Sequence, residues 1–358
     1  MGLMDGKYEY SSLTGKYSQF RTPAGRLKLG GSELPRGVGV EQIGATLSLE
    51  GASAVTFTVA GAYDLKAGGF DPKVKALLKL GTKVSLELGY GSALTEVFQG
   101  YISGVSVNFS DAPSLSITAM DVRGLMMEGT SREEVHVVTT YSAAFQAVMK
   151  RYSALCSELV VDATDADEIA QIVQRTSDYE FVAHILTKKA NREFFVLDGK
   201  AYFREEKKVK APIMTLAWGK GILSFSRNAL YQNLEITVIG FDPDSKEAVK
   251  AKVTETAGTA QKAVGPKHET VISDADALEV AKARKRAEKE AEKRRRKAQS
   301  GAVSCVGLPE LVPGRYVALT GLDKDLDRDY YIQEVRHELG GDGFSTTLEI
   351  GGWKDEPV

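Results

Sequence analysis

Apolar and polar residues alternate along much of the first third of the chain. The alternation has the two-residue period that turns one face of a β-strand toward a core, and glycines and polar residues separate the segments. It predicts strands over residues 46–50, 55–59, 84–90, 97–102, 104–109 and 115–120. Residues 71–81 interrupt them, with Pro72 near the start and Gly81 at the end, which predicts a short helix.

One strand pattern occurs twice. The pattern that begins at Gly81 returns at Gly314, and matched residues keep a nearly constant separation along the chain. The matched pairs are Val84 with Val317, Val105 with Val335, and Ile117 with Leu348. A half-buried β unit that occurs twice predicts two related barrels or sandwiches in one chain. Such doubling lets few subunits imitate a ring with twice as many.

The segment between the two copies has a mixed pattern. Residues 141–152 predict an amphipathic helix, and 159–161 a short strand. Ser177 and Glu180 have the spacing of a capping box, which predicts the start of a second helix. Asp198-Gly199 between two apolar runs predicts a hairpin turn. We therefore expect a small α+β insert here.

Residues 211–245 return to the β pattern and end at Asp242-Pro243. Residues 246–270 have little apolar content and predict a flexible connector, after which Ser273 is expected to cap a helix that reaches Ala298. The predicted organisation has five parts: an N-terminal arm, 1–35; a first β unit, 36–127; the α+β insert, 128–210; a second β unit, 211–245 with 300–353; and a connector with a charged helix, 246–299.

Composition limits the function. The chain has 358 residues, so several domains are expected, and its formal net charge of -2 argues against a generally nucleic-acid-binding surface. Cys156 and Cys305 are the only cysteines, too few for a disulfide framework or a cysteine zinc site. No apolar run has the length of a membrane span, and the N-terminus lacks a secretory pattern. We therefore expect synthesis in the cytoplasm.

The acidic segment from Asp323 to Glu334 is the sharpest metal candidate. Its acids stand at the positions of an EF-hand ladder, but Arg328 occupies the position that requires glycine. An acidic turn between strands is therefore the favoured interpretation. The four histidines are scattered, and no nucleophile elbow, Walker loop or dinucleotide fingerprint occurs. The acids at 162, 165, 167 and 168 predict the first turn of a helix rather than acid–base catalysis.

A basic run lies between Lys282 and Lys297, with ten Lys or Arg residues. Its charges surround the predicted helix at almost every angle, which favours a solvated outer helix. Its predicted apolar foothold lies near its N-terminal end, at Ile272, Ala275, Leu278 and Ala281. Two alternatives remain open. The helix binds an acidic protein neighbour through Arg294, Arg295 and Arg296, or it binds nucleic acid, although no aromatic residues interleave for base stacking.

The order of these elements resembles the late control D family of phage tail hub proteins, and is similar to the N-terminal half of VgrG spikes. Four stretches carry the resemblance: residues 81–121, residues 174–182 with 195–203, residues 237–243, and residues 311–317 with 331–337. Their order along the chain and the internal repeat carry the resemblance together.

The resemblance implies a non-enzymatic homotrimer without cofactors, in which two tube-like barrels per chain make six barrels around an axis. Its implied partners are a tail tube protein, a separate spike protein and baseplate proteins, within a phage tail or injection particle. The chain departs from VgrG because it ends at residues 353–358 without a β-helical spike. A peptidoglycan-degrading tail enzyme and a nucleic-acid-binding scaffold are the other two classes, and lysis and salt-dependent binding assays separate them.

Overall fold

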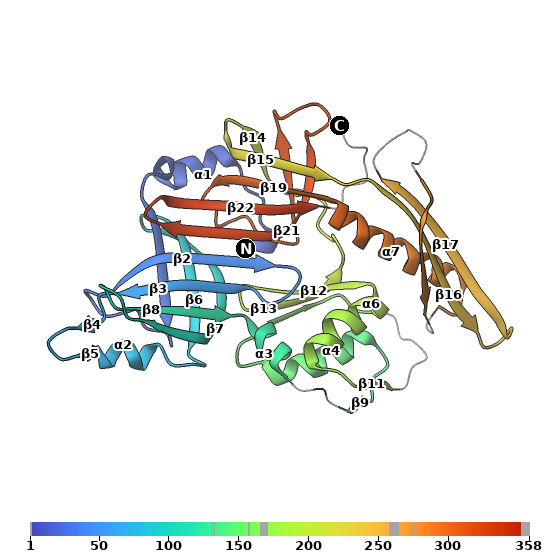
Figure 1. The fold of residues 1–358 in the computed structure, drawn as a ribbon, viewed down its shortest axis with the longest axis horizontal. Helices are drawn as coiled ribbons and strands as arrows, with labels where there is room; N and C mark the ends of the chain where they lie inside the picture. The colour runs from blue at the N-terminus through green and yellow to red at the C-terminus, as the bar shows by residue number, and fades with distance from the viewer. Residues whose placement is uncertain are drawn as a thin grey trace.

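The computed structural model describes residues 2–129, 131, 133–156, 158–164, 171–257, 265–274 and 277–351. Two six-stranded β units lie side by side within one twelve-stranded sheet (Figure 1). The α+β insert lies along one side of them, and a further β unit with a long helix projects at one end (Figure 1). The predicted class, mainly β with two related barrels, an insert and a charged helix, is confirmed.

The first barrel has the strand order β1-β6-β7-β8-β3-β2. Its strands are β1 (Pro23–Leu29), β2 (Gly39–Ser48), β3 (Ala54–Ala60), β6 (Lys83–Tyr90), β7 (Ala93–Asn108) and β8 (Ser114–Met120). Between β3 and β6 lie β4 (Tyr63–Asp64), β5 (Gly69–Phe70) and α2 (Pro72–Leu77), which Asp71 caps. Gly25 lets the two end strands approach, because a Cβ there would lie 3.2 Å from Ile43 Cδ1. The predicted arm therefore contributes β1 to this barrel.

The second barrel is closed by pairing between β21 and β22. Its strands are β14 (Pro212–Trp218), β15 (Gly221–Ala229), β19 (Gln299–Val306), β20 (Tyr316–Thr320), β21 (Arg328–Gly340) and β22 (Gly343–Gly351). The N-terminal segment with α1 (Tyr10–Lys16) packs on β14 of this barrel, and Tyr17 and Phe20, just after α1, also contact Tyr90 of the first barrel. Buried Arg315 holds it there, donating to the carbonyl oxygens of Met4 and Gly6.

The insert folds around its own aromatic core. Its elements are α3 (Val122–Glu128), β9 (Glu134–His136), α4 (Tyr141–Met149), β10 (Glu158–Val161), β11 (Ile172–Gln174), α5 (Asp178–Glu180), a π-helical turn (Phe181–Leu186), α6 (Thr187–Ala190), β12 (Arg192–Leu197) and β13 (Lys200–Glu205). The Ser177 side chain accepts a hydrogen bond from the Glu180 N–H, so the predicted cap is present. The hairpin turns at Asp198 and Gly199, both with positive φ.

The outlying unit corrects the predicted organisation. It consists of β16 (Gln232–Asp242), β17 (Glu247–Ala257), β18 (His268–Ser273) and α7 (Val280–Ala298). β16 was expected in the second barrel, but it pairs only with β17 and β18 among the described strands. The predicted connector is largely strand, because Val249 and Ala251 alternate with polar residues and bury one face against α7.

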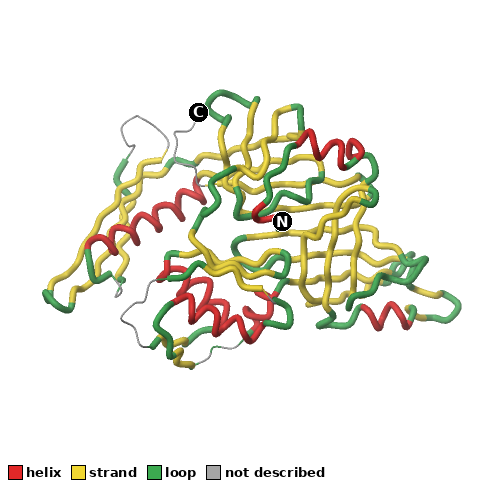
Figure 2. Tube along the Cα trace, turned by 180° about the vertical axis from the view of Figure 1, so that it is seen from behind, coloured by secondary structure: helices red, strands yellow, loops and turns green. Residues whose placement is uncertain are grey.

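The long helix begins at Val280, later than predicted, because Ser273 ends β18 and is not its cap. Its anchoring also differs from the prediction. Ala283, Ala287 and Ala291 form a buried stripe at helical spacing that packs on the β16–β17 ribbon. The helix is therefore held along much of its length, as the view from behind shows (Figure 2). Ala275, one residue of the predicted foothold, lies outside the described residues.

Candidate functional site

The two barrels are joined by a β ladder. β2 pairs antiparallel with β21, from Ile43 opposite Leu339 to Ser48 opposite Glu334. Ladder hydrogen bonds run across this joint, and the buried side chains of both barrels form one continuous core. The joint therefore fixes the position of one barrel against the other.

The two barrels share one strand order. The series β1-β6-β7-β8-β3-β2 corresponds to β14-β20-β21-β22-β19-β15. The matched residues occupy the same register, since Val105 lies opposite Ile117 and Val335 opposite Leu348. One pair differs, because β1 is antiparallel to β6 whereas β14 runs parallel to β20. The repeat predicted from sequence is thus a repeat of strand pairing.

Register shifts recur at the same places in both barrels. The β7–β8 ladder shifts between Ile102 and Gly104, and the β21–β22 ladder shifts between Ile332 and Glu334. The β2–β3 and β15–β19 ladders also shift at matching positions, between Val40 and Ile43 and between Ile222 and Ser224 respectively. Because a bulge redirects side chains, shared bulges keep inward positions equivalent in the two barrels.

The insert is fastened to the first barrel by a buried ion pair. Arg123 is fully buried in α3, and its Nη2 lies 2.7 Å from Asp121 Oδ2. The same guanidinium donates to the Ser48 carbonyl and the Ser53 hydroxyl, at the turn between β2 and β3. Asp121 in turn accepts from the Ser53 N–H. Paired and hydrogen-bonded throughout, this charge pair holds the start of the insert in one orientation.

A second cluster fastens the insert to the second barrel. Arg204 on β13 lies 2.8 Å from Glu193 on β12 and donates to the Gly314 carbonyl at 2.6 Å. The Tyr331 hydroxyl of β21 donates to Glu193 at 2.8 Å. Burial raises the pKa of Glu193 and, with the neighbouring Glu193 charge, raises the pKa of Tyr331. The insert thus bridges both barrels.

The acidic loop from Asp323 to Asp327 is organised by its own carboxylates. Asp327 accepts from the N–H groups of Gly321 and Leu322, both at 2.9 Å, and Asp323 accepts from the Asp325 N–H. Glu334 lies beyond the loop, on β21. The favoured interpretation, an acidic turn between strands, matches this geometry. Of the acids predicted to start a helix, residues 165, 167 and 168 lie outside the described part of the chain.

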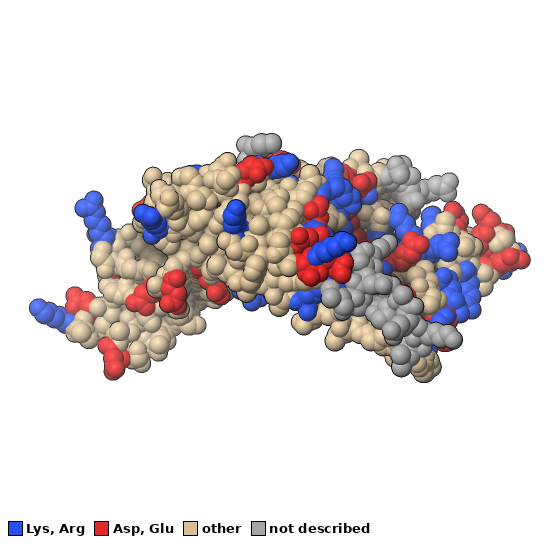
Figure 3. Space-filling model, turned by 90° about the horizontal axis from the view of Figure 1, so that it is seen from above, with Lys and Arg blue, Asp and Glu red and all other residues tan. Residues whose placement is uncertain are grey.

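The predicted docking residues lie near the C-terminal end of α7. Arg295 forms an ion pair with Glu255 of β17, and Arg294 lies 3.4 Å from Glu290 one helical turn earlier. The side chain of Arg296 is outside the described set. Two of the three charges are thus engaged within the outlying unit. Charged side chains of both signs gather on the surface of the part of the molecule that holds the outlying unit (Figure 3).

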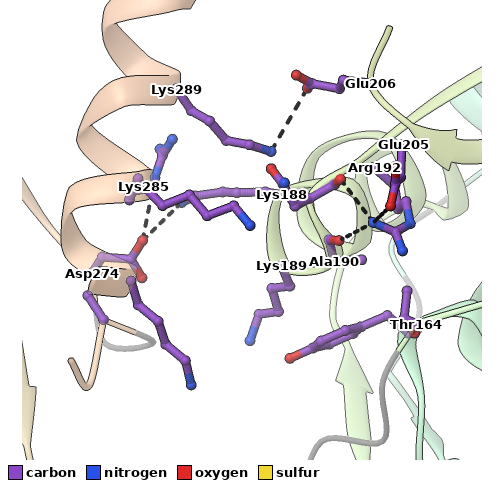
Figure 4. Close-up of a pocket in the computed structure, with 15 residues that line it drawn as sticks. Thr164, Lys188, Lys189, Ala190, Arg192, Glu205, Glu206, Asp274, Lys285 and Lys289 are labelled. Atoms are coloured by element: carbon purple, nitrogen blue, oxygen red, sulfur yellow. Dashed lines mark hydrogen bonds and ion pairs between the residues drawn. The ribbon is translucent and has the colours of Figure 1, made fainter. Parts of the chain in front are cut away.

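A basic cleft of about 680 Å³ separates the insert from α7 (Figure 4). Its charged lining comprises Lys188, Lys189, Arg192, Lys282, Lys285, Arg286 and Lys289, with Glu205, Glu206 and Asp274. Asp274 lies 3.4 Å from Arg286 Nε and 3.9 Å from Lys188 Nζ. Burial, with Lys285 and Arg286 nearby, lowers the pKa of Lys289. Chemically, this arrangement suits an anionic group.

The sequence matches the family described as Alg8 N-terminal domain over residues 21–341, which is most of the chain. The chain belongs to the Alg8 N-terminal domain family. No curated protein matches it in a sequence search.

Solved structures share the fold of this Alg8 N-terminal domain family member. A tail protein from Neisseria meningitidis MC58 is 15% identical with a TM-score of 0.72, covering 92% of this chain and 96% of that chain. The 43 kDa tail protein of prophage MuSo2 from Shewanella oneidensis is 18% identical with a TM-score of 0.71, covering 91% and 97%. The E. coli c3393 protein, a component of the type VI secretion system, is 11% identical with a TM-score of 0.60, covering 93% and 79%.

Sequence reasoning missed two features of this Alg8 N-terminal domain family member. It did not bring Lys188, Lys189 and Arg192 together with the basic helix, although Lys188 and Lys189 lie in the helical run predicted from Ser177 and Arg192 follows that run. It also missed the clusters around Arg123 and Arg204, which no local spacing reveals. Over the described residues, no group of three or more His, Cys, Asp or Glu is placed to hold a metal. None of the described helices is long and apolar enough to span a membrane.

Proposed function

We propose that the chain is a structural hub of a phage tail or a related contractile injection particle. Three copies would form a ring that adapts a six-fold tail tube to a three-fold spike. The observation that supports this most is the pair of barrels with one strand order, held by a continuous ladder. Two equivalent units in one rigid chain let three chains present six similar faces.

The resemblance of the sequence to the late control D family and to the N-terminal half of VgrG supports the same role. The proposed partners are the tail tube protein, a separate spike protein and baseplate proteins, within the assembled particle. The role needs no catalytic centre and no cofactor. The basic end of α7, with Arg294, Arg295 and Arg296, is the proposed contact for an acidic baseplate neighbour.

The mass of the purified full chain under native conditions tests this proposal. We expect three copies per assembly, and averaged images should show six barrels around the axis. A hexamer, or a monomer at every concentration tested, would overturn the hub proposal. Peptidoglycan lysis would favour the enzyme alternative. Nucleic-acid binding that weakens steeply with salt would favour the scaffold alternative.

A further inference from the structure

The second half of β7 has an open edge in a single copy of the chain. From Gly104 to Asn108 this strand pairs with β8 on one side, and no described strand pairs with its other side. Two apolar side chains are exposed there, Val105 at 36% and Val107 at 55%. A strand with an unpaired edge and exposed apolar side chains is prone to accept another strand.

The equivalent half of β21 shows what covers such an edge. Val335 and His337 correspond to Val105 and Val107, and both are fully buried. Their strand has the same partner on one side, β22 in place of β8, but its other side is covered by β2. The difference in exposure between the two barrels thus follows from the presence of one added strand.

The strand equivalent to β2 is β15, and it also has an open edge. Phe225 of β15 corresponds to Ile43, since each follows the matching bulge and faces the matching residue, Val303 or Phe57. β15 pairs with β14 only at Gly221 and Ile222, so beyond these residues no described strand covers that side. One chain therefore carries both halves of a second joint, at sites where they do not meet each other.

We infer that β15 of one copy adds to the edge of β7 in a second copy, as β2 adds to β21 within the chain. This inference rests on the hub proposal and names its subunit contact. Carrying over the observed register places Asn228 opposite Ser106, as Thr46 lies opposite Arg336. It also places Ala229 opposite Val105.

The two edges fit chemically. The pairing satisfies backbone N–H and C=O groups on both strands, and it places Ala229 against exposed Val105 and Arg227, with Phe225 diagonal to it, against exposed Val107. Arg227 stands where Ala45 stands in the joint within the chain, so the new joint is less apolar, as suits a contact made on assembly. Each copy donates one strand and accepts another, so the contact is heterologous, and the hub proposal requires its rotation to close into a ring after three copies.

Paired cysteines test the contact and its register. Ser106→Cys with Asn228→Cys should form disulfides between copies under mild oxidation, giving dimers and trimers on a denaturing gel. The matched control, Thr46→Cys with Arg336→Cys, should crosslink within one chain and leave its mass unchanged. A slipped pair, Ser106→Cys with Ala229→Cys, should crosslink at least tenfold less, because adjacent residues face opposite sides of a strand. Native Cys156 and Cys305 are buried.

The outcomes separate the inference from the hub proposal. A native trimer in which the control pair crosslinks but Ser106→Cys with Asn228→Cys does not would overturn the inference and leave the hub intact. Equal crosslinking of the slipped pair would overturn the register. A persistent monomer would overturn both. As a second measurement, Val107→Lys should raise the dissociation constant of the assembly at least tenfold, whereas Leu80→Lys, also at an exposed apolar residue, should not.

Discussion

Val105 and Val335 occupy equivalent positions in the two barrels, yet Val105 is 36% exposed whereas Val335 is fully buried. Both lie on strands of matching register, and both face a buried residue of the next strand, Ile117 or Leu348. The difference in exposure comes from β2, which pairs with the edge of β21 beside Val335. The equivalent edge of β7, beside Val105, has no such strand among those described. Equivalent sequence positions therefore have different environments within one chain.

Replacing Val335 by Asp should strongly destabilise the fold. The side chain is fully buried at the joint, so the substitution strands a charge without a partner, and we expect a loss of about 3–5 kcal/mol in the free energy of unfolding. Thr347→Asp, on the other face of neighbouring β22, should change it by less than about 0.5 kcal/mol. Urea titrations would measure both, and equal losses would contradict the assigned register.

Replacing Asp198 by Asn should stabilise the protein above neutral pH. Burial, together with Glu96 of β7, raises the pKa of Asp198 to about 7. Its stabilising contribution is therefore present below the ordinary value of 3.8 and lost as pH rises through 7. Asn removes the charge and keeps an Asn-Gly turn, which suits the positive φ.

For this partly exposed group, solvent screening limits the expected gain at pH 8 to about 1–2 kcal/mol. Thermal unfolding of the two proteins at pH 5 and pH 8 is the measurement. If the difference in thermal stability between the two proteins is the same at pH 5 and pH 8, the charge of Asp198 does not destabilise the folded protein. Glu96→Gln, which removes the facing carboxylate instead, should reproduce part of the effect.

The buried histidine of the joint should make the fold sensitive to mild acid. His337 is fully buried with its Nδ1 2.9 Å from Thr346 Oγ1, and burial lowers its pKa from 6.5 to about 3. Below pH 6.5 His337 is protonated in the unfolded chain but stays neutral in the folded chain. Stability present above 6.5 is therefore lost as pH falls toward 3, by about 2 kcal/mol between pH 6.5 and 5.

The His337→Gln variant should lose this part of the pH dependence, although its absolute stability is also expected to fall. Asp198 titrates in the opposite sense over the same range, so the comparison is cleanest in an Asp198→Asn background. Urea unfolding at pH 6.5, 5.5 and 5 measures how steeply the free energy of unfolding changes with pH. An unchanged slope in the variant would assign the acid sensitivity to other groups.

Much of the double barrel was predictable because its strands alternate with large apolar residues. Val84, Ile117 and Leu348 set the period and the repeat without tertiary information. The cap at Ser177 and the turn at Asp198 are likewise local chemistry. The place of the N-terminal arm was harder to predict, because β1 is positioned by pairing with β6, which lies far along the chain.

The outlying unit shows where sequence reasoning failed and why. In β17 the inward residues include small Ala251, and the alternating Lys and Thr residues resemble a flexible segment. In α7 the buried stripe is alanine, which carries little hydrophobic signal beside many charges. The basic cleft and the open strand edges depend on segments brought together by the fold, so no local pattern reveals them.

Reversing the charge of Arg295 should loosen the outlying unit. Its guanidinium pairs with Glu255 of β17, and both side chains are mostly buried, so Arg295→Glu places two like charges in contact. We expect a loss of about 1–3 kcal/mol in local stability. Hydrogen exchange along β17 measures it, and Arg294→Glu, at a more exposed residue, is the matched control.

The double reversal, Arg295→Glu with Glu255→Arg, should restore most of that protection, because it restores an ion pair of opposite polarity. This double variant also separates the effect of Arg295 on the fold from its proposed effect on docking. It keeps the outlying unit folded while it alters the charge that a baseplate neighbour would meet. Assembly that stays defective after β17 regains protection would assign a docking role to Arg295. Assembly that recovers together with protection would leave the ion pair with a purely structural role.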